Sequence, residues 1–404
     1  MTNARMKLLT FTTLYPSIAR PQHGVFVETR LLQLLQSSDI EARVIAPVPW
    51  FPFKYRRFGK YADFAQTPLR EVRSGIDVSH PRYAMIPGPG MYLQPFTLAR
   101  AGARAMRTLR STGFDCDIVD AHYFYPDGVA AALVARRHGK PLVVTARGSD
   151  INVLAEFAYP RRLIVWAAMQ ARAIVTVSTA LKDKLVGLGI EAQRIFVLRN
   201  GVDLELFRPM PRDAARESLG ISAGSLMVSV GNLVPDKGHA LAIDALAELP
   251  EMRLAIVGDG PERRELERYA ERRGVSRRVS FLPVRPQAEL SAVYSAADVL
   301  VLASFREGWP NVLLEAMACG TPVVAANVGG VPEIVTEPAA GRIVTEHSGA
   351  AFARAVREVL RPGPSREAIR RFSQRFDWAA TSRGQLSVFA RAMSDRSAAA
   401  EAVA

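Results

Sequence analysis

Runs of β-branched and other apolar residues alternate along the whole chain with longer stretches of helical character. In the first half the apolar runs are MKLLTFTTLY, EARVIAP, GIDVSH, CDIVDAH, PLVVTAR and AIVTVS. In the second half they are SLMVSVG, MRLAIVGDG, RRVSFLP, DVLVLAS, TPVVAA and GRIV. Continuous apolar strands separated by helices are typical of parallel sheets that helices cover on both faces. We therefore expect an α/β protein with two doubly wound, Rossmann-like parallel-sheet domains.

The 404 residues exceed what one hydrophobic core usually sustains, so two domains are expected. The break falls in VLRNGVDLELFRPMPRDAARESLG, where an Asn-Gly pair and two prolines mark a turn and a linker. We place an N-terminal domain at 1–204 and a C-terminal domain at 205–375, followed at 376–404 by a helix that packs back on the first domain and a frayed tail. In open parallel sheets ligands bind beyond the carboxyl ends of the strands, so we expect the active site in a cleft between the two sheets.

Positive charge is concentrated in the first half of the chain. The formal net charge is +13, and residues 1–204 hold 27 Lys and Arg against 15 Asp and Glu, or +12, which leaves +1 for the rest. No helix-turn-helix, zinc-finger or aromatic RNA-binding signature accompanies this charge, so we expect no nucleic acid partner. An anionic membrane surface or a phosphate-bearing substrate fits the charge better.

Residues 49–64, PWFPFKYRRFGKYADF, interleave aromatic rings with Lys and Arg side chains. This mixture settles at lipid headgroups, which makes the segment a candidate contact with an anionic membrane surface. The alternative is an aromatic loop that packs on its own domain. The sequence favours neither interpretation over the other.

Cysteine usage and the N-terminus indicate the compartment. Cys116 and Cys319 lie far apart in apolar contexts, which gives no disulfide framework and suits a reducing cytoplasm. The first residues, MTNARMKLLTFTTLYPS, lack a small-residue cleavage site and favour a first strand over a signal peptide. No run approaches the roughly 18 apolar residues of a membrane span. We expect a cytoplasmic protein, peripheral on the inner face of the membrane if residues 49–64 bind lipid.

One carboxylate stands alone in an apolar stretch. Glu315 is the only charged residue between Glu307 and Glu333 in REGWPNVLLEAMACGTPVVAANVGGVPE. Pro310 suits the first position of a helix and Gly320 suits its end, which places Glu307 at the helix entrance and Glu315 in the second turn. Two carboxylates and the backbone N–H groups of a helix entrance suit a ligand with hydroxyl groups and negative charge.

The alternative is that Glu315 lies on a solvated helix face, as single Glu residues most often do. Its apolar neighbours argue against this. A buried, ionised carboxylate costs several kcal/mol unless it accepts hydrogen bonds. Vicinal ribose hydroxyl groups would supply them.

Lys237 is a second candidate. In VSVGNLVPDKGHALAIDAL it stands at the entrance of a helix that follows a strand, where phosphates bind. The chain holds 45 Arg but only 7 Lys, and Lys237 is the only Lys after Lys184, so a compact ammonium stands where the chain otherwise uses Arg. Chance placement of one Lys is the alternative, and the spacing of a P-loop is absent.

Two further patterns carry less weight. Gly258-Asp259-Gly260 lacks the third glycine of a dinucleotide fingerprint and is better explained as a tight strand-to-helix turn. Asp115 and Asp117 have the spacing of a metal-chelating pair, but they precede a strand and so belong to the opposite edge of the sheet. We therefore expect no metal site.

The first half offers three candidates. DIVDAHYFYPDGVAAALVARRHG ends a strand at His122, and TARGSD places Arg147 at the end of the next strand. Both positions belong to the sheet edge that binds ligands, although a lone His is more often structural. The loop in YPSIARPQHGVFVETRLLQLL ends at Gly24 before an amphipathic helix, which gives a second helix N-terminus at a strand end.

These motifs together resemble the family 4 retaining glycosyltransferases of the GT-B fold over essentially the whole chain. The resemblance rests on the Glu-x7-Glu pair, Glu307 and Glu315, and on VGNLVPDKG, NGVD with FRP, VGDGP and AADVLVLAS in the family's order. It implies an acceptor-binding N-terminal domain and a C-terminal domain that binds a nucleotide-diphosphate sugar, without a metal or other cofactor.

The resemblance also implies roles. His122, Glu307 and Lys237 would be catalytic: the histidine contacts the donor sugar, the glutamate holds its hydroxyl groups, and the lysine neutralises the leaving diphosphate. Glu315 would accept the ribose hydroxyl groups, and Arg285 would border the base. The implied donor-binding set is Gly24, Arg147, Gly231, Asn232, Lys237, Arg285, Glu307, Gly308, Trp309, Asn311 and Glu315.

Two positions depart from the family pattern. Asn232 stands where the family usually has Arg, and Arg147 or Arg306 are the candidates to replace that cation. Pro310 stands where Gly is common, which removes one N–H that could face the sugar. Without a metal, Lys237, a neighbouring Arg and helix N-termini must stabilise the leaving diphosphate.

The expected activity is that of a hexosyltransferase acting on a lipid-diphosphate-linked or polysaccharide acceptor in bacterial exopolysaccharide or envelope glycan assembly. A nonhydrolysing nucleotide-sugar 2-epimerase shares the architecture and is one alternative. A membrane-associated scaffold without catalysis is another, and the intact Glu pair and Lys237 argue against it.

Overall fold

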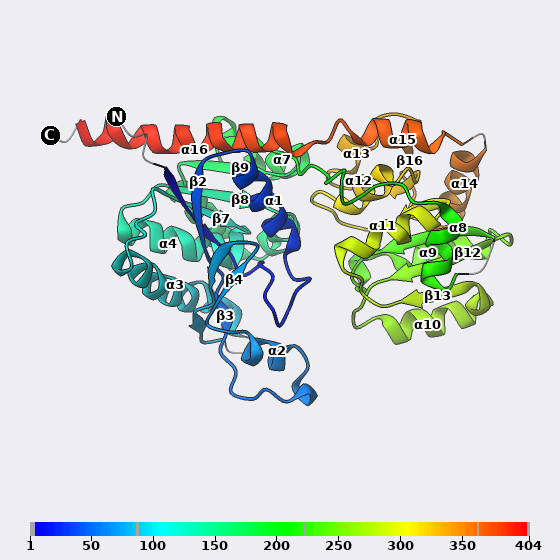
Figure 1. The fold of residues 1–404 in the computed structure, drawn as a ribbon, viewed down its shortest axis with the longest axis horizontal. Coiled ribbons are helices and arrows are strands. Elements are labelled where there is room, and N and C mark those ends of the chain that lie inside the picture. Colours follow the sequence, from blue (N-terminus) through cyan, green and yellow to red (C-terminus); the bar gives the residue numbers. More distant parts are fainter. Residues whose placement is uncertain (1–4, 86–88, 222–223, 362, 402–404) are drawn as a thin grey trace. The chain divides into compact units, whose positions relative to one another are not determined.

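The computed structural model describes residues 5–85, 89–221, 224–361 and 363–401. The chain forms two compact units: unit 1 comprises Met1–Arg199 and Ala379–Ala404, and unit 2 comprises Asn200–Trp378. Each unit is built around a sheet of its own (Figure 1). The units therefore divide the chain a few residues from the boundaries that the sequence suggested.

An eight-stranded sheet forms the centre of unit 1, in the order β10-β9-β8-β7-β1-β2-β5-β4. Neighbouring strands are parallel except β4, which pairs antiparallel with β5. Chain order reverses at β1, which lies between β2 and β7, and doubly wound sheets bind ligands at such a switch point. The strands are β1 (Met6–Phe11), β2 (Ile40–Ile45), β4 (Arg70–Arg73), β5 (Ile76–Ser79), β7 (Ile118–His122), β8 (Leu142–Ala146), β9 (Ala173–Thr176) and β10 (Ile195–Val197).

Helices and a short second sheet complete unit 1. The small sheet pairs β3 (Val48–Pro49) with β6 (Arg82–Tyr83). The helices are α1 (Val25–Gln36), α2 (Lys60–Gln66), α3 (Gln94–Ser111), α4 (Val129–His138), α5 (Ser149–Asn152), α6 (Ala158–Gln170), α7 (Thr179–Gly187) and α16 (Trp378–Glu401).

The long C-terminal helix α16 contributes to the core of unit 1 (Figure 1). Its Phe389 is fully buried in one apolar cluster with Leu8 of β1 and Val27 of α1. The sequence suggested a frayed end from about residue 394, but the helix continues to Glu401. Small residues such as the alanines near this end favour the helical conformation even without apolar periodicity.

Unit 2 has a six-stranded, fully parallel sheet in the order β13-β12-β11-β14-β15-β16. Its strands are β11 (Ser225–Val230), β12 (Met252–Val257), β13 (Val279–Leu282), β14 (Val299–Leu302), β15 (Val323–Ala326) and β16 (Gly341–Val344). Its helices are α8 (Arg212–Leu219), α9 (His239–Ala247), α10 (Arg263–Arg272), α11 (Gln287–Ala296), α12 (Asn311–Ala318), α13 (Val331–Ile334), α14 (Gly349–Leu360) and α15 (Arg366–Ser373).

The predicted fold class, two Rossmann-like parallel-sheet domains, is confirmed. Each of the twelve apolar runs contains a strand at the expected place. The sequence missed β3, β4, β6 and β10, which are short or lie at a sheet edge. Strand β4 reads REVR because an edge strand is not buried on both faces and needs no continuous apolar run.

Candidate functional site

Lys237 and Glu307 form an ion pair at the carboxyl ends of two neighbouring strands of unit 2. The Nζ atom of Lys237 lies 2.6 Å from Oε1 of Glu307, and the glutamate side chain is only 8% exposed. Lys237 ends a short 3₁₀ turn, η6 (Pro235–Lys237), that follows β11, and Glu307 lies in the loop after β14. Because β11 pairs with β14, the sheet itself brings the two charges together.

Two glycines hold the backbone of this site close. Gly238, the residue before α9, has φ +63°, and a Cβ atom there would lie 2.0 Å from the carbonyl oxygen of Ala303. Gly329 has φ +53°, and its Cβ atom would lie 1.9 Å from the carbonyl oxygen of Glu307. No other residue type fits either position, so the loop after β14 is fixed between η6 and the segment after β15.

Glu315 is buried, as its apolar neighbours indicated. It lies on α12 with 7% of its surface exposed, and its Oε2 accepts a hydrogen bond of 2.6 Å from the Tyr294 hydroxyl. Burial raises the pKa of Glu315 to about 7, and the Tyr294 hydrogen bond opposes this shift. The sequence proposed ligand hydroxyl groups as the partner, but the protein already supplies one.

Tyr294 was missed because nothing in the apolar run before β14 distinguishes it from a core residue. Its own pKa is raised well above the ordinary value, by burial first and then by Glu315, so it stays a hydrogen-bond donor. Among the described residues, this hydroxyl is the one group that donates to the Glu315 carboxylate. Acceptor capacity is therefore left for a ligand.

The start of α12 differs from the sequence expectation. Pro310 has an extended backbone and precedes the helix, which begins at Asn311, so it is not the first helical residue. Gly320 does follow the helix, with φ +76°. A proline fits just before the helix because its φ is fixed and the position needs no N–H donor.

The side chains of Trp309 and Asn311 serve the packing of unit 2. The Trp309 Nε1–H donates to the carbonyl oxygen of Asn200 at 3.0 Å, and its ring contacts Phe376. The Asn311 Oδ1 accepts a hydrogen bond of 3.2 Å from the Asn200 side chain. Gly308 is buried beside them. These side-chain contacts hold the segment within unit 2.

The loop after β11 is supported from beneath by His239. Its Nε2–H donates to the carbonyl oxygen of Asn232 at 3.2 Å, and its Nδ1 accepts from the Ser229 hydroxyl at 2.9 Å. Burial lowers the pKa of His239 to about 4, which keeps the ring neutral. The Asn232 side chain is exposed, and the aliphatic stem of Lys237 passes close to Gly231.

Arg285 lies beyond β13, at the edge of the same sheet. Its guanidinium forms an ion pair of 2.9 Å with Glu289 of α11. Arg306 is exposed in the loop before Glu307. Thus unit 2 gathers Lys237, Glu307 and Glu315 on neighbouring elements, and Arg285 stands two strands away from β11.

His122 is almost fully buried in unit 1, although the sequence placed it where side chains face a cleft. The imidazole is 2% exposed, with Nε2 at 3.2 Å from Asp120 and Nδ1 at 2.6 Å from the guanidinium of Arg147. Because Arg147 can only donate, Nδ1 is the acceptor and Nε2 carries the proton. Burial lowers the pKa of His122 to about 4, so the ring is neutral.

Arg147 joins His122 to the segment that begins at Gly24. Its guanidinium lies 5.4 Å from the Phe26 ring of α1, and burial lowers its pKa to about 9. Gly24, with φ +72°, precedes that helix, and a Cβ atom there would lie 2.3 Å from the backbone of Leu14. Unit 1 therefore brings these three predicted residues to one edge of its sheet.

Two buried aspartates that the sequence did not single out tie the loops of this edge together. Asp127 accepts hydrogen bonds from the backbone N–H of Thr13 at 2.6 Å and from the Thr12 hydroxyl at 3.2 Å. Asp150 accepts from the N–H groups of Phe124 and Gly148, both at 2.8 Å. Burial raises the pKa of Asp127 to about 7. Each carboxylate joins a loop after one strand to a loop after its neighbour.

The absence of a metal stays a prediction. In the described part of the chain, no group of three or more His, Cys, Asp or Glu side chains is arranged to hold a metal ion. Asp115 pairs with Lys140 at 2.9 Å, and Asp117 accepts from the N–H of Lys7, so both have partners within the protein. None of the described helices is both long and apolar enough to cross a membrane.

Comparisons with known proteins cover both units. The family described as Glycosyltransferase Family 4 matches residues 27–206, and the family described as Glycosyl transferases group 1 matches residues 211–376. A glycosyltransferase assigned to teichuronic acid biosynthesis, TuaC of Bacillus subtilis, is 32% identical over 336 residues, which cover 81% of this chain and 83% of the relative. The D-inositol 3-phosphate glycosyltransferase of Mycobacteroides abscessus is 32% identical over 359 residues, 84% of this chain and 80% of the relative.

Solved structures have the same fold. Sucrose-phosphate synthase from Thermosynechococcus elongatus superposes with a TM-score of 0.79 at 19% identity, covering 95% of this chain and 98% of that chain. HepE of Anabaena, in complex with UDP and glucose, superposes with a TM-score of 0.72 at 25% identity and the same coverage.

Proposed function

Since the chain belongs to the family 4 glycosyltransferases of the GT-B fold, we propose that it transfers a hexose from a nucleotide-diphosphate sugar to a lipid-linked or polysaccharide acceptor, with retention at the anomeric carbon. The observation that carries the proposal is the pair of Lys237 and Glu307 beside the buried Glu315. A donor brings a diphosphate, a sugar and a ribose, and these three residues offer a cation and two carboxylates.

Lys237 would stabilise the departing diphosphate. As the glycosyl bond breaks, negative charge grows on the leaving oxygen, and an ammonium placed there in advance lowers the barrier. Lys237 stands at the N-terminus of α9, where the backbone N–H groups add positive potential. In the described conformation its charge is held by Glu307, so we expect the phosphates to compete for the ammonium when the donor binds.

Glu307, once shared between lysine and ligand, would accept hydrogen bonds from the sugar hydroxyl groups. Glu315 would accept the ribose hydroxyl groups with the oxygen capacity that Tyr294 leaves unused. Arg147, which is partly exposed at the edge of the sheet in unit 1, would contact the donor, and His122 would hold its guanidinium in position. Lys237 and helix N-termini would take the place that a metal ion has in other transferases, so we expect metal-independent turnover.

A nucleotide sugar is the proposed donor, with UDP, GDP and ADP as the candidate nucleotides. Support comes from HepE, which was solved with UDP, with UDP and glucose, and with UDP-glucose. UDP-sugars are therefore the first candidates in a thermal-shift screen that also includes GDP- and ADP-sugars. Stabilisation by one class, followed by acceptor-dependent release of its nucleoside diphosphate, would support the proposal. No stabilisation by any of them would contradict it.

Incubation with the donor alone separates transfer from epimerisation. An epimerase converts the nucleotide sugar to its isomer without acceptor, whereas a transferase leaves it intact or hydrolyses it slowly. The scaffold alternative predicts no turnover under any condition.

An anionic membrane surface is the proposed location of the acceptor. In the segment 49–64, rings of Phe51, Phe53 and Phe58 pack on one another, so part of it is the self-packed loop that was the alternative. Yet Trp50 is 62% exposed and Tyr55 is 64% exposed. The segment thus has a packed base and a projecting aromatic edge, a combination that suits the headgroup layer.

A basic groove between α3 and α4 supports the same location. Its exposed arginines have no ion pair with a carboxylate in the described part of the chain, and Phe96 lies at one end. Gln94, at the start of α3, donates to the Tyr83 hydroxyl, and the Trp50 N–H donates to the Tyr83 carbonyl oxygen, so the groove and the aromatic edge lie near each other. The groove arginines are Arg100, Arg104, Arg107, Arg136 and Arg137.

We place the enzyme in the cytoplasm, peripheral on the inner face of the membrane, in bacterial exopolysaccharide or envelope glycan assembly. The similarity to TuaC, a protein of teichuronic acid biosynthesis, supports an envelope polymer as the product. Lipid-diphosphate-linked acceptors are held at that membrane face, which would explain the strongly basic first half.

A further inference from the structure

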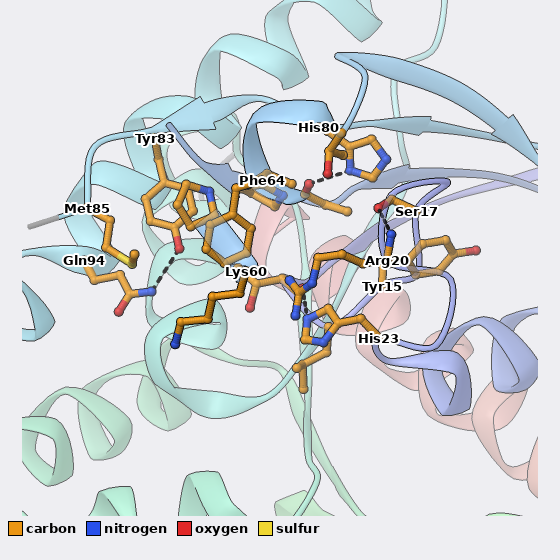
Figure 2. Close-up of a pocket in the computed structure, with 17 residues that line it drawn as sticks. Tyr15, Ser17, Arg20, His23, Lys60, Phe64, His80, Tyr83, Met85 and Gln94 are labelled. Atoms are coloured by element: carbon orange, nitrogen blue, oxygen red, sulfur yellow. Dashed lines mark hydrogen bonds between the residues drawn. The ribbon is translucent and has the colours of Figure 1, made fainter. Parts of the chain in front are cut away.

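A pocket opens in unit 1 at the carboxyl ends of β1, β2 and β5 (Figure 2). Its lining comes from the loop after β1, the segment around β3, helix α2, strand β6 and the start of α3, and all of these belong to unit 1. The residues that the sequence assigned to the donor do not line it. The pocket is therefore distinct from the set of predicted donor-binding residues.

Arg20 is the central polar group of the pocket. Its side chain is partly buried, and its guanidinium lies 5.1 Å from the Phe64 ring of α2. Within the described residues, no carboxylate forms an ion pair with this guanidinium and no group accepts a hydrogen bond from it. Burial lowers the pKa of Arg20 from its ordinary value, so the guanidinium has lost water without gaining a hydrogen bond or an ion pair within the described residues. A bound anion would restore what burial removed.

Lys60 adds a second cation at the rim. It is exposed, its ammonium lies 5.7 Å from the Tyr61 ring, and it has no ion pair in the part of the chain that the structure describes. The Tyr83 hydroxyl, which also lines the pocket, accepts from Gln94 at 3.1 Å and keeps its own proton to donate. His23 donates to the carbonyl oxygen of Thr13, and burial lowers its pKa to about 4, so it is neutral.

The carboxylates around the pocket are accounted for. Asp63 lies near enough to Arg20 to favour its charged form but makes no ion pair with it within the described structure. Glu71 is held by His80, whose Nε2 lies 2.7 Å from its Oε1. The second oxygen of Glu71 accepts from the N–H of Ile18 at 3.1 Å. The pocket therefore offers a ligand two cations, Arg20 and Lys60, and one carboxylate, Asp63, lies nearby.

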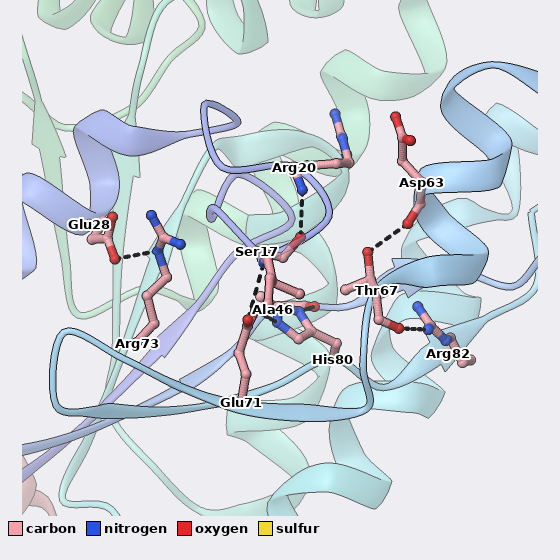
Figure 3. A network of polar contacts seen from close by, with 11 residues as sticks. Ser17, Arg20, Glu28, Ala46, Asp63, Thr67, Glu71, Arg73, His80 and Arg82 are labelled. Atoms are coloured by element: carbon pink, nitrogen blue, oxygen red, sulfur yellow. Dashed lines mark hydrogen bonds and ion pairs between the residues drawn. The ribbon is translucent and has the colours of Figure 1, made fainter. Parts of the chain in front are cut away.

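Hydrogen bonds fix the walls in advance (Figure 3). The Arg20 N–H donates to the carbonyl oxygen of Ser17 at 3.0 Å, and Glu71 connects the same loop to His80. His80 in turn donates from Nδ1 to the carbonyl oxygen of Ala46 at 3.0 Å. The loop that carries Arg20 is therefore fastened to the ends of β2 and β5, and little ordering remains to be done on binding.

We propose that this pocket binds an anionic group of the acceptor, a phosphoryl or carboxylate group, through Arg20 and Lys60. The inference rests on the proposed transferase function and names the acceptor chemistry that it lacks. A planar guanidinium binds either group through two parallel hydrogen bonds, and the Phe64 ring holds its plane in position. A neutral sugar would leave the half-buried charge of Arg20 without compensation.

Three small probes test the proposal by isothermal titration: glucose 1-phosphate, glucuronic acid and glucose. We expect the first, the second, or both to bind the wild-type protein at least about tenfold more tightly than glucose, the effect of one charge-assisted contact. A preference for glucose 1-phosphate alone assigns a phosphoryl group, and equal binding of both acids assigns any anion. Equal binding of all three probes contradicts the proposal.

Substitutions in the pocket test whether Arg20 and Lys60 cause the preference for the anionic probe. Arg20→Gln and Lys60→Gln should each remove most of the preference for the anionic probe. Arg57→Gln is the matched control, because it removes an exposed cation of the same segment that does not line the pocket. Asp63→Asn should leave the preference intact or increase it. Unchanged preference in Arg20→Gln, or equal loss in Arg57→Gln, would overturn the assignment.

Binding of UDP-glucose, GDP-mannose and ADP-glucose is measured on the same proteins as the separate readout of the donor site. If none of them binds the wild-type protein, the proposed function fails. If one binds but the probes show no preference for the anion, only the pocket assignment fails.

Discussion

The ammonium of Lys237 lies 2.6 Å from the carboxylate of Glu307, and each is the residue that the donor would need. The ion pair offsets the cost of burying the Glu307 carboxylate in the unliganded protein, because a nearly buried carboxylate without a partner costs several kcal/mol. It also means that donor binding exchanges one ion pair for two new contacts. Substitution of Lys237 should therefore change kcat more than the affinity for the donor.

Lys237→Ala should lower kcat by about 100-fold or more, with a smaller change in the Kd of the donor. The loss of one preorganised positive charge from the leaving group has that magnitude in other enzymes. Steady-state rates together with titration of the donor separate the two quantities. Equal losses in kcat and affinity would show that the lysine only binds the donor.

The same variant removes the ion-pair partner of the nearly buried Glu307, so lower stability is expected. The double variant Lys237→Ala with Glu307→Gln removes that charge and is the control. It should recover most of the lost Tm without recovering kcat. Recovery of kcat would mean that the single variant was only poorly folded.

Tyr294→Phe should destabilise the protein by about 1–3 kcal/mol, since it leaves Glu315 without the hydrogen bond that it now accepts. The variant should also raise the pKa of Glu315 further. Urea denaturation at pH 8 measures the first effect. Tyr269→Phe removes a less buried hydrogen bond of the same kind, from a tyrosine hydroxyl to the carboxylate of Asp244, and is the control that should cost less. Equal losses of stability in the two variants would show that the hydrogen bond to Glu315 contributes no more than the one to Asp244.

Glu315 gives unfolding stability a defined dependence on pH. Its pKa is raised from 4.5 to about 7 in the folded protein, so between these values the folded chain holds one more proton than the unfolded chain. Stability from this group is therefore complete below about pH 4.5 and is lost as pH rises to about 7. Glu315→Gln cannot titrate, and relative to the wild type it should gain up to about 3 kcal/mol between pH 4.5 and 7.5. Asp127 shifts in the same direction but is common to both proteins. Parallel stability curves would contradict the buried, titrating carboxyl.

His122 should not appear in the pH dependence of the reaction. Burial holds its pKa near 4, and both ring nitrogens have partners, Asp120 and Arg147. We expect His122→Gln to lower kcat while leaving the shape of the pH profile of kcat/KM above pH 5.5 unchanged. A break between pH 6 and 7 that vanishes in the variant would instead identify the imidazole as an acid or base.

Membrane binding should depend on both basic features of unit 1. Neutralising Arg56 and Arg57 tests the segment 49–64, and neutralising Arg100, Arg104 and Arg107 tests the groove on α3. Each set should weaken co-sedimentation with vesicles that contain anionic lipid, by about 1 kcal/mol per charge near the surface. Full binding by the first set would favour the self-packed loop. Equal binding to neutral vesicles would exclude an electrostatic contact altogether.

The strands and the domain class could be predicted because buried parallel strands require continuous apolar runs, and this requirement leaves a local signal. The position of Glu315 was predictable for the same reason, since a charge in an apolar helix is conspicuous. The helix entrance followed from the Lys237-Gly238 pair after a strand, and the rarity of lysine in this chain singled out Lys237 as a candidate.

What could not be predicted depends on contacts between distant segments. Tyr294 of α11 donates a hydrogen bond to Glu315 of α12. Asp127 accepts a hydrogen bond from Thr13, which lies more than a hundred residues earlier in the chain. The hydrogen bond between His122 and Arg147, which occupies the imidazole, forms because β7 pairs with β8. Arg20 lies in a loop whose Ile18 N–H donates a hydrogen bond to Glu71. Glu71 belongs to β4, an edge strand that the sequence did not predict.

The most direct test of donor binding by Glu315 is a comparison of UDP with 2′,3′-dideoxy-UDP by titration on the wild-type protein and on Glu315→Gln. If the screen selects a different nucleotide, that nucleotide and its 2′,3′-dideoxy form are compared instead. We expect the wild-type protein to bind the dideoxy nucleotide at least about tenfold more weakly, and Glu315→Gln to bind both nucleotides with nearly equal, reduced affinity. A variant that still distinguishes the two as strongly as the wild type would contradict the assignment of the ribose to Glu315.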